Sequence, residues 1–191
     1  VPTPNAASVC SGGGGGGGSP QLILTEVFYD ASGADNGLEW VEIKNVGTAS
    51  ATLSGYSLGW GGSDYTTGKL QLSGTLAAGA VMVVGGTTSN ATNFNPTLTQ
   101  ASDFNPDIQN GDSPGDGLAL FDVPASSITG STVPIDAVVW GSNNTSGLID
   151  ETGSANAPEV GPSADGTSIE RTTLGGAWQV QTTPTPNSCS L

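Results

Sequence analysis

The feature that most constrains this chain is a succession of short apolar runs separated by breaks rich in Gly, Pro, Asn and Asp. In the run at 38–45, the apolar residues Val41 and Ile43 alternate with Glu42 and Lys44. A period of two residues is that of a β-strand, and no segment sustains the 3.6-residue apolar period of an amphipathic helix. The pattern therefore predicts an all-β protein.

The strand-like runs are spaced along most of the chain, at residues 21–29, 38–45, 51–60, 68–74, 79–86, 117–122, 134–141, 167–172 and 177–181. Pro and Gly stand between the runs, where ladder hydrogen bonds are not needed. This spacing is typical of an antiparallel sandwich. We expect a β-sandwich of about eight or nine strands.

The domain organisation follows from a shift in composition near residue 20. Residues 1–20 are predicted to be an N-terminal tail with a polyglycine linker, and residues 21–191 to be one β-sandwich domain. A polyglycine segment is a flexible tether because Gly loses the most entropy on ordering. We expect it to act as an assembly arm, formed by Gly12, Gly13, Gly14, Gly15, Gly16, Gly17 and Gly18.

The charge balance limits the classes of binding partner that we expect. Seventeen acidic and three basic residues give a net charge of −14, which repels phosphate backbones and anionic bilayers. No apolar run approaches the roughly 18 residues that a membrane span needs. We expect neither nucleic-acid binding nor a membrane span.

The same composition argues against catalysis. The chain contains no histidine, so it lacks a histidine general base and the usual nucleophile triads. Two carboxylate pairs, Glu39 with Glu42 and Asp150 with Glu151, have the residue types of a glycosidase site. Nothing in their surroundings distinguishes them from ordinary strand and turn acids, and we expect no enzymatic activity.

The two cysteines, Cys10 and Cys189, flank nearly the whole chain. Their placement and the scarcity of lysine favour an extracellular protein with a disulfide between them. The bridge can lie within one chain or link two chains. Two unpaired thiols, or a lipid anchor on Cys10, are the alternatives.

Two acidic loops are candidates for a cation site, because calcium prefers several oxygen ligands on flexible loops. The first offers Asp107, Asn110, Asp112 and Asp116, and the second offers Asp30, Asp35, Asn36 and Glu39. Neither has EF-hand spacing, and Asp and Asn are also common in turns for their own backbone bonding. Calcium in the first loop is the cofactor considered, and no other is expected.

The polar segment 87–116 places Phe94 and Phe104 in two similar stretches, "NFNPTL" and "DFNPDI". We expect a long loop held on the sandwich by these two rings. The alternative is a protrusion that binds a partner.

Arg171 is the only arginine and lies in a strand pattern. We expect it to form a structural ion pair with Glu26 or Glu42, and the alternative is a solvated surface arginine. Among the tryptophans we expect a largely buried set and one more exposed member. The buried set is Trp40, Trp140 and Trp178, and the exposed one is Trp60, which precedes a turn.

Several stretches together resemble the lamin tail domain family. They are "LTEVFYD" with "EWVEIKNVGTASATLSGYSL", then "GTLAAGAVMVV", "GDGLALFD", "IDAVVWG" and finally "DGTSIERT", "AW" and "TPTPNS". They occur in order from about residue 21 to residue 188. The resemblance implies an immunoglobulin-like fold and, without coiled-coil heptads, a secreted bacterial-type member. Asn187 departs from the glycine usual at that position, and the loop 87–116 is long.

The ending "PTPN" at 184–187 also occurs at 2–5. Because the resemblance places this motif at the end of such a domain, the start of the chain looks like the last residues of a preceding domain of the same kind, followed by a glycine linker. Coincidence is the alternative.

These features favour a secreted, non-enzymatic structural module at the cell surface or outside the cell, self-associating into a homo-oligomer or filament. One alternative is a calcium-assisted module that binds glycans or mineral surfaces through exposed Trp60 and Tyr65. Another is an accessory domain of a larger secreted enzyme.

Overall fold

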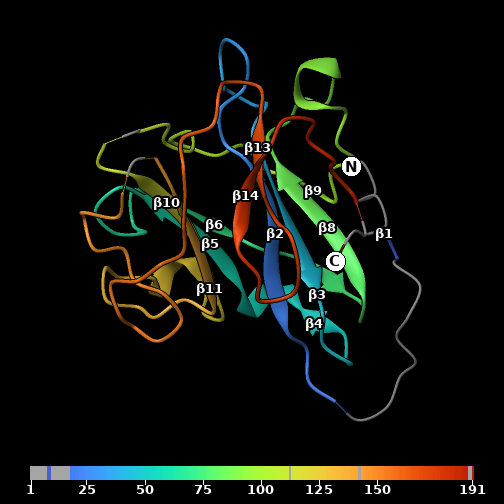
Figure 1. Ribbon diagram of the computed structural model, residues 1–191. Coiled ribbons are helices and arrows are strands. Elements are labelled where there is room, and N and C mark those ends of the chain that lie inside the picture. The colour runs from blue at the N-terminus through green and yellow to red at the C-terminus, as the bar shows by residue number, and fades with distance from the viewer. Residues whose placement is uncertain (1–7, 10–17, 112, 142, 189–190) are drawn as a thin grey trace.

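The computed structural model describes residues 8–9, 18–111, 113–141, 143–188 and 191. Within these ranges the chain forms strands and three short 3-10 helices, Leu53–Gly55, Ala91–Asn93 and Ala125–Ser127. Two sheets pack face to face (Figure 1). The predicted all-β, immunoglobulin-like sandwich is confirmed. No helix in the described ranges has the length and hydrophobicity needed to cross a membrane.

The larger sheet contains seven strands. Its order is β1 (Ser8–Val9), β8 (Ala80–Gly85), β3 (Trp40–Asn45), β2 (Leu22–Phe28), β13 (Ser168–Arg171) and β14 (Trp178–Gln181), with β9 (Gln100–Ala101) also on β8. The five-stranded sheet has the order β12 (Glu159–Val160), β11 (Asp136–Trp140), β10 (Asp116–Phe121), β5 (Ser57–Gly61) and β6 (Gly68–Gln71). A small third sheet pairs β4 (Ala51–Thr52) with β7 (Thr75–Leu76). All pairings are antiparallel except β8–β9 and β11–β12.

The main core lies between the two sheets and is built from the predicted alternation. Val41 and Ile43 of β3 face it, together with Leu58 of β5 and Leu118 and Leu120 of β10. Residues on the other face of β3 do not reach this core. Because inward and outward residues alternate along each strand, the chemistry of the outer face is set by the positions between the core residues.

A β-bulge interrupts the pairing of β2 with β3, between Leu24 and Glu26. Leu24 and Val27 both contact the main core, so the extra residue, Thr25, is accommodated on the outer side together with Glu26. A bulge places two residues of one strand opposite one of its partner and re-aims the side chains there. The bulge therefore brings two polar side chains to one spot on the outer face.

The long segment 87–116 lies against the sandwich, as predicted. Phe104 is buried, with its ring 5.2 Å from that of Trp60, and Phe94 packs edge-on against Phe28 at 6.0 Å. The loop contains the 3-10 helix Ala91–Asn93 and strand β9. The expectation that the two phenylalanines hold this loop is confirmed.

The structure also contains two-residue strands that the sequence pattern did not predict, namely β1, β7, β9 and β12. Two residues are too few to show a period of two, so these strands have no signal of their own. β1 is the most consequential, because Ser8 and Val9 lie in the region predicted to be a tail and pair with Val81 and Ala80 of β8.

Candidate functional site

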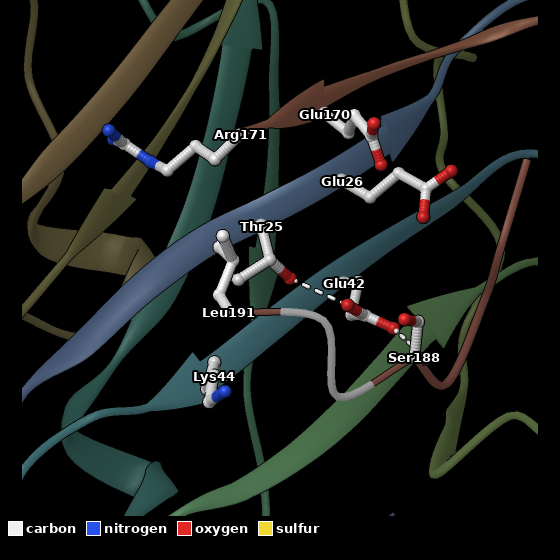
Figure 2. A pocket seen from close by; sticks show the side chains of 8 residues that line it. All are labelled: Thr25, Glu26, Glu42, Lys44, Glu170, Arg171, Ser188 and Leu191. Atoms are coloured by element: carbon white, nitrogen blue, oxygen red, sulfur yellow. Dashed lines mark hydrogen bonds between the residues drawn. The ribbon is translucent and has the colours of Figure 1, made fainter. Parts of the chain in front are cut away.

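The end of the chain folds back over the outer face of the larger sheet (Figure 2). We call residues 182–188 the C-terminal strap. Beneath it lie Glu26 of β2 and Glu42 of β3, which are directly paired across the two strands. Two ionised carboxylates in this arrangement repel each other. The strap and its surroundings supply hydrogen-bond donors to both.

Glu26 is 3% exposed and accepts hydrogen bonds from three donors. The backbone N–H of Thr185 donates to its Oε1 at 3.0 Å, and the Thr185 hydroxyl donates to its Oε2 at 3.2 Å. The hydroxyl of Ser168 donates to Oε1 at 2.5 Å. Thr185 thus binds this carboxyl group through both its backbone and its side chain.

Glu42 is also 3% exposed. Its Oε1 accepts a hydrogen bond from the hydroxyl of Thr25 at 2.7 Å, and its Oε2 accepts one from the backbone N–H of Ser188 at 3.1 Å. The β2 bulge is what places Thr25 within reach. Glu42 therefore links the bulge on one side to the strap on the other.

Burial sets the electrostatics of this pair. It raises the pKa of Glu26 to about 7, against the hydrogen bonds from Ser168 and Thr185, which lower it. Burial also raises the pKa of Glu42 to about 8, and the neighbouring charge of Glu26 adds to the rise. Desolvation disfavours the charged form of a carboxyl group. Both carboxyl groups therefore titrate near neutral pH in the state in which they bind the strap.

A small cavity remains between the strap and the sheet (Figure 2). It is lined by Thr25, Glu26, Glu42, Lys44, Glu170, Arg171, Ser188 and Leu191. The side chain of Arg171 points away from Glu26 and Glu42 (Figure 2). We call the outer-face surface beneath the strap, formed around Glu26 and Glu42, the strap groove.

Asn187 fixes the strap at its far end. Its side-chain Oδ1 accepts a hydrogen bond from the backbone N–H of Thr97 at 2.7 Å, and its Nδ2 donates to the Thr97 carbonyl at 2.9 Å. Its φ of 64° lies in the left-handed region, which Gly adopts freely and Asn tolerates best among the other residues. The departure from the family's usual glycine therefore keeps the backbone conformation and adds two hydrogen bonds.

The predicted partners of Arg171 were wrong. Its guanidinium forms an ion pair with Asp136 of β11, while Glu26 and Glu42 are bound by the strap instead. Arg171 also donates from Nε to the carbonyl of Leu24 at 3.0 Å. Asp136 in turn accepts a hydrogen bond from the backbone N–H of Leu24 at 2.8 Å. The arginine is buried as expected, but its pair joins the two sheets rather than lying within one.

The predicted exposure of Trp60 was also wrong. Trp60 is 1% exposed, and its Nε1 donates to the carbonyl of Pro106 at 3.1 Å. It lies over Gly68, where an added Cβ would come within 2.1 Å of the indole ring. Trp60 shares a face with Leu58, so the alternation along the strand indicated burial more reliably than the turn that follows. Trp40, Trp140 and Trp178 are buried as predicted.

Tyr65, the other aromatic residue proposed for surface binding, is buried too, and its hydroxyl donates to the carbonyl of Ile149 at 2.9 Å. A glycan platform requires aromatic faces that a sugar can reach. Neither Trp60 nor Tyr65 offers one.

The two acidic loops lie close together and are joined by hydrogen bonds. The side chain of Asn110 bridges the loops by donating to Asp35 at 2.8 Å, and Gly111 donates its N–H to Asp116. Glu39 accepts the N–H of Ile108 at 2.9 Å, and burial raises the pKa of Glu39 to about 9. Among the described residues, no three Asp, Glu, His or Cys side chains are placed to hold a metal ion. Asp112 lies outside the described residues.

Three of the four acids in the two candidate carboxylate pairs accept hydrogen bonds from the surrounding chain. Glu39 accepts the backbone N–H of Ile108, whereas Glu42 accepts that of Ser188 in the strap. Asp150 is in an exposed turn, where it accepts hydrogen bonds from Thr152. Glu39 and Glu42 thus bind segments distant in sequence, and Asp150 binds its own turn.

Cys10 and Cys189 lie outside the described residues, as do Gly12 to Gly17, while Gly18 is exposed. The neighbours of the cysteines are described. Val9 pairs with Ala80 on β8, and Ser188 donates to Glu42 on β3, the strand next to β8. Both flanking segments thus reach adjacent strands of one sheet, and the disulfide stays a prediction.

A family model of the lamin tail domain matches residues 17–157. The match covers well over half of the 191 residues, and the chain belongs to the lamin tail domain family. The matched region ends before β12, so the strap lies beyond it. Comparison with curated proteins and with solved structures found no match.

Proposed function

We propose that this lamin tail domain is a non-enzymatic structural module of an extracellular assembly, and that it associates with copies of itself. The family is one of immunoglobulin-like structural domains. The buried acids support a structural role, since Glu26 and Glu42 bind the strap and Asp136 joins the sheets. A fold alone does not confer function, so the proposal rests on these contacts and on the N-terminal strand.

The observation that carries self-association is the pairing of β1 with β8. β1 contributes only two residues, Ser8 and Val9, to the edge of β8. Residues 10–21, which include seven consecutive glycines, separate it from β2. A short strand on a glycine-rich tether can add to the same edge of a neighbouring copy, because the backbone groups it satisfies are identical there. Repeated around or along an array, this head-to-tail contact generates a ring or a filament.

Electron microscopy and light scattering of the purified chain test the proposal. We expect regular fibres or discrete oligomers, and a shift to monomer when Ser8 and Val9 are both replaced by proline, which cannot donate a ladder hydrogen bond. Gly14→Pro, in the tether, is the matched control and should leave assembly intact. A chain that stays monomeric over the whole concentration range would refute the proposal.

A further inference from the structure

The first half of β2 has a strand partner on one side only. β3 pairs with β2 from Leu22 to Phe28, whereas β13 pairs with it only at Glu26 and Val27. After Arg171 the chain turns back to form β14. In the described part of the chain, no strand therefore pairs with β2 on this side before Glu26, and the larger sheet has a gap there.

The hydrogen bonds between β2 and β3 show which backbone groups point into the gap. The N–H of Val46 donates to the carbonyl of Gln21 at 2.8 Å, so the bonds to β3 fall on Gln21 and Ile23 in this antiparallel pair. The N–H and carbonyl groups of Leu22 and Leu24 therefore point away from β3, into the gap.

The backbone groups of Leu24 and Leu22 differ in what satisfies them. The N–H of Leu24 donates to Asp136 at 2.8 Å, and its carbonyl accepts from Arg171 at 3.0 Å, so this ion pair takes the place of a strand partner. Among the described residues, none forms a hydrogen bond with the outward N–H or carbonyl of Leu22. Unpaired backbone groups at the edge of a strand are a template for pairing with another chain.

The gap is hollowed out as a groove. Two hollows of about 740 Å³ and 290 Å³ share Gln21, Ile23 and Ile135 in their walls and so form one continuous surface. We call this surface the β2 groove. Leu174, in the turn that follows β13, lines the larger hollow and is 59% exposed. Such apolar walls beside an open strand edge are the surroundings in which an extended peptide adds to a sheet.

The rim of the β2 groove is acidic. Glu151 lines the larger hollow and Asp122 lines the smaller one, and both residues are exposed. Neither side chain forms a hydrogen bond or an ion pair with another residue that the structure describes. Positive side chains of a partner therefore find two acids at the rim without displacing an existing contact.

The charges of this chain argue against a second copy as the occupant. Of its three basic residues, Lys44 and Arg171 are buried and Lys69 donates to the carbonyl of Ile128 at 2.7 Å. Two copies, each with a net charge of −14, also repel each other. The acidic rim therefore favours a different protein that carries positive charge.

We propose that the β2 groove binds an extended segment of another protein as an added β-strand, and that this segment has apolar residues at alternate positions flanked by Lys or Arg. Its backbone bonds the N–H and carbonyl of Leu22. Its apolar side chains pack against Ile135 and Leu174, and its basic side chains pair with Glu151 and Asp122. The contact goes beyond the self-association through β1 and does not depend on it.

The side-chain contacts are tested by panning a phage-displayed library of random seven-residue peptides against the wild-type chain, followed by fluorescence anisotropy of the enriched peptide. We expect alternating apolar residues with Lys or Arg beside them. Leu174→Ser should weaken binding about five- to tenfold, whereas Val180→Ser, at an exposed apolar residue outside the groove, should not. The absence of an enriched peptide, or equal binding to both variants, would overturn the inference.

The charge of the rim has its own matched pair of variants. Glu151→Gln should weaken binding of the enriched peptide about two- to fivefold, and more strongly at low salt. Asp165→Asn removes an exposed acid outside the groove and should leave binding unchanged. Equal effects of the two substitutions would show that the peptide responds only to net charge, and would overturn the proposed site.

The backbone contact is tested by methylating single amide nitrogens of the enriched peptide. Because an added strand bonds its partner through every second residue, methylation should abolish binding at alternate positions and be tolerated between them. In hydrogen exchange followed by NMR, the bound peptide should slow the amide of Leu22 and change that of Ile23 little. Loss of binding without alternation, or an unchanged Leu22 amide, would refute strand addition. Slowing of the Leu22 amide that grows with protein concentration alone would identify a second copy as the occupant and overturn the proposal.

Discussion

Replacing Arg171 by methionine removes a buried positive charge while keeping a side chain of similar length. The guanidinium contacts Asp136, the carbonyl of Leu24 at 3.0 Å and the carbonyl of Gly176 at 3.3 Å, and it stacks 4.9 Å from the ring of Trp178. Methionine can replace only the packing. Asp136 is 6% exposed and would stay buried without a counter-charge.

Removing one partner of a buried ion pair typically costs about 3–5 kcal/mol of unfolding free energy. For a domain of 150–250 residues, each kcal/mol shifts the melting temperature by about 2–4 °C. We therefore expect Arg171→Met to lower the melting temperature by about 6–20 °C. Burial already raises the pKa of Asp136 to about 6 with Arg171 opposing the rise, so in the variant this pKa should increase further.

The assay is thermal and urea unfolding followed by circular dichroism, with wild type, Arg171→Met, Asp136→Asn and the double variant in one cycle. Arg171→Lys is the matched control, since it keeps the charge but loses the planar fork that reaches several acceptors at once, and its loss should be intermediate. The double variant should lose less than the sum of the two single variants. A melting temperature of Arg171→Met within about 2 °C of wild type, with an unchanged urea slope, would refute the reasoning.

Three further predictions concern the strap and the chain ends. Burial raises the pKa of Glu26 to about 7 and that of Glu42 to about 8 from an ordinary value of 4.5. The stability they contribute is therefore complete below about pH 4.5 and is lost as the pH rises through 7 to 8, so the melting temperature should fall between pH 5 and pH 8.5 and less so in Glu42→Gln. A melting temperature that rises over this interval would contradict the assignment. Asn187→Ala should destabilise the strap by about 1–3 kcal/mol in urea unfolding, whereas Asn187→Gly, which suits the left-handed backbone, should lose less. The reverse order would show that the backbone conformation is not limiting. Cys10 and Cys189 should be oxidised, so non-reducing electrophoresis should show a fast monomer band for an internal bridge or a ladder for linked chains, and mass spectrometry finding two free thiols would exclude both.

The sequence predicted those parts of the fold that depend on local alternation. The run at 38–45 gave β3 with Val41 and Ile43 inward, because a half-buried strand imposes its period on its own residues. The ending of the chain was recognised by its motif, and the loop 87–116 by its two phenylalanines. These features are visible within a few neighbouring residues.

The partners of individual polar groups were not predictable in this way. Asp136 lies on β11 and Arg171 on β13, in different sheets, and both side chains bind the backbone of Leu24 beside the bulge. No local sequence pattern reveals that these two strands lie close together. Trp60 was placed at the surface from the turn after it, although its alternation with Leu58 indicated the core. The strap contacts join strands to a segment about 145–160 residues away, and no local sequence pattern predicted them.

The distance in sequence between β2 and the elements that cover it also affects the order in which the domain folds. Ile169 of β13 pairs with Val27, and Thr185 binds Glu26, so the groups that complete this strand are synthesised long after it. During translation, Glu26 and Glu42 therefore stay open to water and ionised until the strap arrives. Contacts this remote in sequence slow folding, because the entropy of closing the loop is lost before the contact is gained. Closure of the strap is therefore expected to be a late step of folding, with proton uptake by the two carboxyl groups as its measurable accompaniment.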